Sequence, residues 1–383
     1  MRRRRAARRH KGNLRFWTGY VALSVLATPL ADLGAASLTN QPPLAVWDVL
    51  VRAEVGGGYR DNVLQTQVAP ESSPFVSVAA DASFIRLSET GSEFTLFLMG
   101  QDLEYSDAPS VSGERFVSGT MQFARPITPQ DKLGVELQYL YQKQVLDVSE
   151  TEVDLARVLV EGHSFTLRPK WNHKLGTNWE TRLEAIGQRQ IYSGDLGDFW
   201  EAGGKLTLAR SYGYRSELSL NAQSVHWIYD DREQTDSQGN EISGTSLVFW
   251  RPEVFGQWRH RWDEQRHWTT TTKVGWLYNQ DNGSGYFDYD RLQLTQKLRW
   301  RQGAWEIAGG ARLGWYYHRV QKEGSEHRER SYVTLDLRVE RRLGKHCFVY
   351  AMGERDWNWS NDPLDEYNDW MASAGVGVEF EVT

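Results

Sequence analysis

Charged side chains recur at every second position through much of the C-terminal half of this chain, with apolar residues between them. Successive side chains of a β-strand point to opposite faces, so these charges share one face. Charges gathered in this way have two uses. They line a water-filled conduit and set its ion preference, or they pair into a salt-bridged network that braces a closed interior. The residues are Arg251, Glu253, Lys273, Arg291, Lys297, Arg299, Glu306, Arg312, Asp336, Arg338 and Glu340.

Enzyme and metal motifs are nearly absent. The sequence has no Gly-x-Ser-x-Gly elbow and no His-Glu-x-x-His motif. His163 and Ser164 are adjacent, and adjacent strand residues face opposite sides, so they cannot form a catalytic dyad. The acidic run Asp281, Asp288 and Asp290 lacks the spacing of an EF-hand and is typical of a solvated loop. We therefore expect no enzyme, no metal and no cofactor.

The alternation of apolar and polar residues predicts the elements that carry these charges. Leu133, Val135 and Leu137, for example, have Gly134 and Glu136 between them. Several such stretches reach about twelve to sixteen residues, whereas globular strands average about five or six and a tilted membrane strand needs roughly 9–11. Short turns and longer loops alternate between them. The pattern predicts an all-β transmembrane antiparallel up-and-down β-barrel of about 16 strands, with 14 to 18 open.

The connections and two prolines give further expectations. Longer connections are expected near 144–154 and 320–330. No connection matches a long constriction loop that folds into the lumen, and this disfavours a highly selective pore. Pro169 and Pro252 fall inside expected strands. Proline cannot donate a hydrogen bond to the ladder, so we expect a bulge or a strand end at each.

The first residues resemble an export leader. Eight basic residues precede or border an apolar run over 16–30, and small residues follow at 34–36. This order predicts a secretory signal peptide over 1–36, cleaved after Ala36 or alternatively after Ala27. A short periplasmic segment at 37–46 and the barrel at 47–383 complete the predicted organisation. The expected location is the bacterial cell outer membrane, after cleavage of the signal peptide.

Composition is compatible with an exported barrel. Without 1–36 the chain keeps 36 Lys and Arg against 49 Asp and Glu, a balance of −13 that argues against nucleic acid as a partner. Cys347 is the only cysteine, so an intrachain disulfide is impossible. The mean hydropathy of −0.59 is low for a membrane protein, but only every second residue of a barrel strand faces lipid.

Tryptophan is abundant and often lies where a strand meets a short turn. The chain has 17 Trp and 17 Tyr. Indole rings favour the headgroup region of a membrane. Tryptophan pairs that bracket short turns therefore predict an interfacial girdle in contact with lipid and lipopolysaccharide. The alternative is that they are ordinary aromatic residues of a β-sheet. The paired residues are Trp171 and Trp179, Trp262 and Trp268, and Trp300 and Trp305.

The last strand and the first carry resemblances to known proteins. Gly375, Val378 and Phe380 are spaced as in the C-terminal signal read by the outer-membrane barrel-assembly machinery, although three residues follow the aromatic one. The start Gly56-Gly-Gly-Tyr-Arg-Asp-Asn-Val63 resembles the β-barrel porin 2 family, within the wider class of Gram-negative outer-membrane barrels of porin type.

A barrel of 16 to 18 strands is wide enough for an aqueous channel, so we expect a porin-like channel for transport of small hydrophilic solutes or ions. The resemblance implies one alternative, a component of a polysaccharide or protein export or surface-assembly system with periplasmic partners. Another is a plugged structural barrel that presents external loops.

Overall fold

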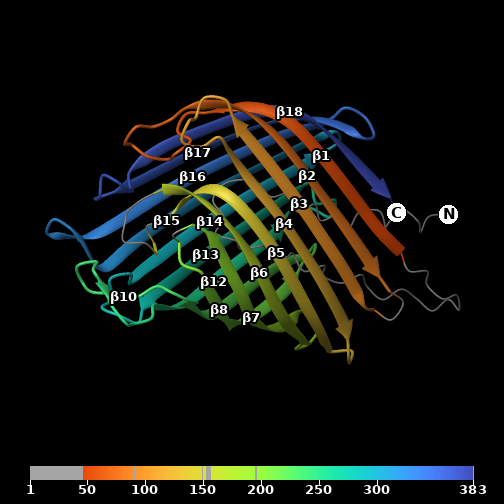
Figure 1. Ribbon diagram of the computed structural model, residues 1–383. Coiled ribbons are helices and arrows are strands. Elements are labelled where there is room, and N and C mark those ends of the chain that lie inside the picture. Colours follow the sequence, from red (N-terminus) through yellow and green to blue (C-terminus); the bar gives the residue numbers. More distant parts are fainter. Residues whose placement is uncertain (1–45, 89–90, 149, 152–156, 195, 383) are drawn as a thin grey trace, which may run out of the picture. The chain divides into compact units, whose positions relative to one another are not determined.

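The computed structural model describes residues 46–88, 91–148, 150–151, 157–194 and 196–382. In these residues sixteen strands form one closed antiparallel barrel, and β10 and β11 form a separate two-stranded sheet (Figure 1). The predicted fold class and strand number are confirmed. The expected signal peptide, its cleavage sites and the segment 37–45 lie outside the described residues. No helix in the described part is long and apolar enough to cross a membrane.

The barrel strands are long and follow one another around the wall in chain order. Each pairs with its sequence neighbours, β9 pairs with β12 across the β10–β11 hairpin, and β18 closes the barrel on β1. The first half contains β1 (Val46–Arg60), β2 (Ser73–Leu87), β3 (Glu93–Tyr105), β4 (Gly113–Pro126), β5 (Asp131–Asp147), β6 (Arg157–Lys174), β7 (Trp179–Ser193), β8 (Phe199–Tyr212) and β9 (Ser216–Tyr229). The second contains β10 (Gln234–Thr235), β11 (Glu241–Ile242), β12 (Val248–Arg261), β13 (Trp268–Asp281), β14 (Tyr289–Gln302), β15 (Trp305–Glu323), β16 (Glu326–Arg342), β17 (Cys347–Ser360) and β18 (Tyr367–Val382).

The outer face of the barrel is apolar, as the alternation predicts. Leu292 and Leu298 of β14 and Leu337 of β16 are each close to half exposed, at 48%, 45% and 52%. Aliphatic side chains this open would be unfavourable in water but are stable against lipid. The polar residues between them point to the inside.

One predicted connection is wrong. The expected loop at 320–330 is only the turn between Glu323 and Glu326, because β15 and β16 continue past the other strands. Gly324 supplies the left-handed backbone of this turn, with φ of 61°. The pairing between the two strands shifts between Tyr317 and Lys322, so the projecting part of this hairpin is irregular. Polar side chains in this part made the sequence read as a loop.

The expectation for the two prolines is also wrong. Pro169 lies inside β6 and Pro252 inside β12, and neither strand ends or changes register there. Each proline pairs continuously with the strand on one side, at Val135 and Ser224 respectively, while the ladder is interrupted on the other side. A missing N–H therefore costs pairing with one neighbour only, and the strand needs no bulge.

Candidate functional site

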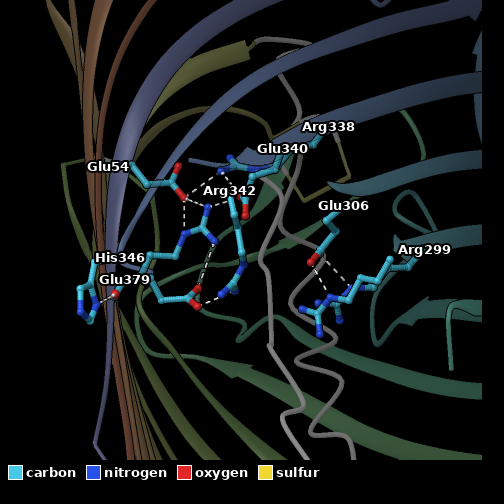
Figure 2. A network of polar contacts seen from close by, with 10 residues as sticks. Glu54, Arg299, Glu306, Arg338, Glu340, Arg342, His346 and Glu379 are labelled. Carbon is cyan, nitrogen blue, oxygen red and sulfur yellow. Dashed lines mark hydrogen bonds and ion pairs between the residues drawn. The ribbon is translucent and has the colours of Figure 1, made fainter. Parts of the chain in front are cut away.

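Contacts between non-adjacent strands identify the inside of the barrel. Arg52 of β1 forms an ion pair with Glu340 of β16 at 2.5 Å, although β17 and β18 lie between these strands in the wall. Arg338 Nη2 lies 2.8 Å from Glu54 Oε1 across the same gap. Side chains of strands that do not pair can meet in this way only across the concave side of the sheet. Figure 2 shows Glu54 projecting from its strand toward Arg338 and Glu340.

The eleven charged residues expected on the inner face all have the parity of that face. On β14, Arg291, Lys297 and Arg299 alternate with the exposed Leu292 and Leu298. On β16, Asp336, Arg338 and Glu340 alternate with exposed leucines in the same way. The same parity holds for the remaining members, Arg251, Glu253, Lys273, Glu306 and Arg312. Whether they line a conduit stays a prediction.

Part of this set forms a salt-bridged network. Glu306 accepts a hydrogen bond from Arg299 at 3.0 Å (Figure 2). It accepts another from Arg301 at 2.5 Å. Elsewhere on the inner wall, Glu379 of β18 pairs with Arg342 at 2.5 Å. Bracing by ion pairs, the alternative left open by the sequence, therefore operates along this part of the wall. Arg301, Arg342 and Glu379 were missed, although strand parity would have found them.

A second part is a row of lysines on nearby strands. Lys205 of β8 and Lys273 of β13 lie on either side of Phe255 of β12, with ammonium groups 5.6 and 3.8 Å from the ring centroid. Lys273 also reaches Glu253 at 3.3 Å. Lys297 of β14 continues the row and is exposed although it has the parity of the inner face. This exposure indicates room for water beside it.

Carboxylates gather on another part of the wall. Asp356 of β17 stands directly across from Asp369 of β18, and both are only 2% exposed. Glu354 lies two positions before Asp356 and faces the same way. Arg60 of β1 bridges this group to β4, at 2.8 Å from Asp369 and 3.3 Å from Glu114. The interior thus has lysines with nearby glutamates on one part of the wall, and carboxylates with Arg60 on another.

One loop does fold inward, which corrects the expectation that none would. Glu150, in the connection between β5 and β6, reaches the far wall and accepts hydrogen bonds from Tyr289 at 2.7 Å and Tyr316 at 2.5 Å. These tyrosines lie on β14 and β15, across the barrel from β5. In Figure 1 the yellow ends of β5 and β6 curve toward β14 and β15. The sequence missed this because the contacts of this connection are distant along the chain.

Other long connections pack apolar residues inside the same end of the barrel. Val63, from the β1–β2 connection, is fully buried in a cluster with Phe75 and Tyr105. Leu247 and Phe287, from two further connections, are buried at 0% and 1% against Phe199, Phe249 and their neighbours. The long-loop end is therefore narrowed by packed side chains as well as by Glu150.

The six predicted girdle tryptophans lie at the short-turn end. Four of them have exposed side chains: Trp262 at 57%, and Trp179, Trp268 and Trp305 at 43% each. The indole N–H of Trp171 donates a hydrogen bond to Asp131 at 3.1 Å. The rings of Trp268 and Trp300 pack against each other with centroids 6.0 Å apart. A second row at the other end of the strands was missed. It comprises Trp200, Trp250, Trp276, Trp315, Trp359 and Trp370, all more than a third exposed. Trp250 and Trp258 on β12, or Trp268 and Trp276 on β13, mark an apolar band of about 25 Å along the strand, at roughly 3.3 Å per residue.

The three residues of the expected assembly signal lie on the closing strand. Val378 pairs with Ala53 of β1, and Phe380 is exposed on the outer face beside His346. A Cβ on Gly375 would collide with the carbonyl oxygen of Val55, so the closure of the barrel requires glycine here. Recognition by an assembly machine remains a prediction.

The residues that suggested other chemistry have structural partners. His163 contacts the Tyr139 hydroxyl at 3.0 Å, and Ser164 is buried on the other face of β6. The Asp281 carboxylate accepts backbone N–H groups of Gly283, Gly285 and Phe287 at 2.8 to 2.9 Å and so shapes its own loop. Within the described ranges, no group of three or more His, Cys, Asp or Glu could hold a metal.

Comparisons with known proteins give similarity in structure only. No protein-family model and no curated sequence matches the chain, so the resemblance to the β-barrel porin 2 family remains a prediction. OccAB1 of Acinetobacter baumannii aligns over 89% of this chain and 98% of its own, at 9% identity and a TM-score of 0.45. The anion-selective porin of Comamonas acidovorans aligns over 88% and 100%, at 8% identity and 0.47. CdiB from Acinetobacter baumannii aligns over 87% and 60%, at 9% identity and 0.46. The strand pairing of the chain itself establishes the barrel fold.

Proposed function

We propose that the barrel is a porin-like channel that passes small hydrophilic solutes or ions across the bacterial outer membrane. The observation that carries the proposal is the charged inner face of a closed barrel of sixteen strands, on which Lys297 is exposed. Lys205, Lys273 and Lys297 follow one wall, and Asp356 and Asp369 stand on another. Barrels of this size hold water, and an exposed charge on the inner face influences which ions pass.

Single-channel conductance in a planar bilayer tests the proposal. Lys297→Glu replaces an exposed positive charge on the inner wall with a negative one. The ion selectivity of the variant channel should therefore shift toward cations. Lys345→Glu, in the exposed turn between β16 and β17, changes the net charge equally but lies off the wall and serves as the matched control. Stable open steps with a shift only in Lys297→Glu support the channel. A silent barrel that still migrates as a folded species contradicts it.

One observation favours a second candidate, a plugged barrel that presents its loops to partners. Val63, Leu247 and Phe287 pack inward from three different connections, which reduces the opening at the long-loop end. This candidate predicts no ion flux in any variant. The same bilayer measurement therefore separates the two candidates.

We propose the outer membrane as the location, with cleavage of residues 1–36 and assistance from the barrel-assembly machinery. The two rows of exposed tryptophan around an apolar band support it, because indoles favour membrane interfaces and would contact lipid and lipopolysaccharide. Fractionation of the expressing cell, with mass spectrometry of the mature N-terminus, tests the location and decides between Ala36 and Ala27.

A further inference from the structure

Two tyrosines and three arginines of the far wall converge on the single carboxylate of Glu150. The Tyr289 hydroxyl donates to Oε2 at 2.7 Å and the Tyr316 hydroxyl to Oε1 at 2.5 Å. Around them, the guanidinium groups of Arg330 and Arg251 lie 3.6 and 4.0 Å from the two oxygens. This arrangement surrounds both carboxylate oxygens with donors and positive charge.

The arginines also set the direction of the tyrosine hydrogen bonds. Arg251 donates to the Tyr289 oxygen at 3.1 Å, and Arg291 donates to the Tyr316 oxygen at 3.5 Å. A phenol that accepts from a guanidinium has its own proton available for an anion, and charge-assisted hydrogen bonds of this kind are the strong ones. The five side chains are therefore arranged to receive a carboxylate.

The receiving side chains are held rigidly, whereas the carboxylate comes from a loop. Tyr289 and Tyr316 are 1% and 6% exposed and pack against each other with ring centroids 5.4 Å apart. Arg251 stacks over Trp227 at 3.8 Å, and Arg330 lies over Tyr316 at 4.4 Å. All of them belong to strands β9 and β12 to β16 of the closed wall. A site that is fixed by strands does not depend on the loop for its shape.

The positive charge of the arginines around Glu150 makes this site favourable for anions. Three arginines face it. The nearest carboxylates are Glu150 itself and Asp147, which pairs with Arg330, while Asp365 and Glu201 interact with Arg330 and Arg251 respectively. Without Glu150, two of the three guanidinium charges would face the interior without their present carboxylate. A buried cation that loses its nearest carboxylate is less well compensated, so an emptied site would attract another anion.

We propose that Tyr289, Tyr316, Arg251, Arg291 and Arg330 form a binding site for the carboxylate group of small organic solutes, and that Glu150 occupies this site when no solute is bound. A carboxylate solute enters by replacing Glu150 on the two tyrosine hydroxyls. This inference rests on the proposed channel function and names its solute class.

Binding of acetate to the refolded mature chain tests this site without reference to ion flux. Line broadening of 13C-labelled acetate measures weak binding directly, and acetamide is the uncharged probe of the same size. We expect Glu150→Ala to bind acetate more tightly than the wild type, because the tethered competitor acts at an effective concentration of about millimolar. A dissociation constant of about 0.1 mM for that competitor would make the gain about tenfold. Acetamide should bind to neither protein.

Matched variants keep the test decisive. Glu161→Ala removes a glutamate that accepts from Tyr141 at 3.1 Å on the outer face, and it should bind acetate as the wild type does. Adding Tyr289→Phe and Tyr316→Phe to Glu150→Ala should abolish the gain. Heat-modifiable migration shows that each variant is folded, and Glu150→Gln replaces Glu150→Ala if the latter is not.

Equal acetate binding by the wild type and by a folded Glu150 variant overturns the inference, as does a gain that survives loss of both hydroxyls. If the barrel conducts ions but does not bind acetate, the carboxylate site is rejected and the proposed channel function stands. Acetate binding in a barrel without conductance would reject the channel and keep the site.

Discussion

Asp147, the last residue of β5, forms an ion pair with Arg330 of β16, which stands on the other side of the barrel. Arg330 is 8% exposed, so the pair is largely removed from water. It ties the inward-turned end of β5 to the far wall, beside the place where Glu150 binds. The pair thereby holds the loop across the interior.

Removal of this tie should open the barrel further. Asp147→Asn leaves the size of the side chain unchanged but removes the charge that attracts Arg330. We expect larger single-channel conductance steps or more frequent openings in planar bilayers. Asp290→Asn, which breaks an exposed pair with Arg319 at 2.8 Å, is the control and should conduct like the wild type. A conductance unchanged in Asp147→Asn would show that the β5 end does not limit flow.

Acid should release Glu150 from its contact with the tyrosines and arginines, and the direction in which its pKa is shifted determines the pH range of this release. Burial alone would raise the pKa of this carboxyl, but Arg291, Arg330 and Arg251 hold it below its ordinary value. The ionised form is thus favoured in the folded protein, and the contact is stable above the ordinary range of a glutamate. It is lost as the pH falls through the lowered pKa, below about 4.5. The charged and titratable groups around Glu150 are Asp147 of β5, Arg251 of β12, Tyr289 and Arg291 of β14, Tyr316 of β15, and Arg330 and Tyr332 of β16.

Conductance measured from about pH 7 to about pH 3 checks this release. The wild type should show a step below about pH 4.5 that Glu150→Ala lacks, because the alanine variant is already released. Asp147 is present in both proteins, so their difference isolates Glu150. A step near neutral pH in the wild type would contradict the lowered pKa.

Breaking the buried network at the first strand should cost more than breaking an exposed pair. Arg52 and Glu340 are 3% and 2% exposed and lie 2.5 Å apart. Glu340→Gln leaves Arg52 with less compensation for its charge, and we expect a loss of about 3–5 kcal/mol in the free energy of unfolding. Glu104→Gln disrupts a pair with Arg115 on the exposed surface and should cost about 1 kcal/mol or less. Urea unfolding in detergent or lipid compares the two, and equal losses would contradict the bracing role of the network.

The seam between β1 and β18 should depend on glycine. Gly375→Ala places a Cβ against the Val55 carbonyl oxygen, which belongs to the backbone and cannot move aside easily. Overpacking of this kind costs about 1–3 kcal/mol, so the urea midpoint and the yield of folded barrel should fall. Gly187→Ala on β7 is the control, since a Cβ added there would meet nothing within 4 Å. A wild-type yield from Gly375→Ala would show that the seam can shift.

Local pattern in the chain was sufficient to predict the barrel and its inner face. Side-chain alternation is a property of each strand alone, so the parity of Lys297 against Leu298 was readable without any partner strand. Long strands and alternating turn lengths predicted about 16 strands, with 14 to 18 left open. Local polarity also misled: the projecting hairpin around Gly324 read as a loop, and Pro169 and Pro252 read as breaks.

The meeting of inner charges, and what fills the interior, could be known only from the folded barrel. Glu150 contacts Tyr289 and Tyr316, which are 139 and 166 residues away in the chain. Curvature of the closed sheet brings these strands opposite the β5–β6 connection, and no spacing within one strand encodes that distance. The carboxylate site, the tie from Asp147 to Arg330 and the inward apolar clusters all depend on this closure, which joins residues that pair with different neighbours around the wall.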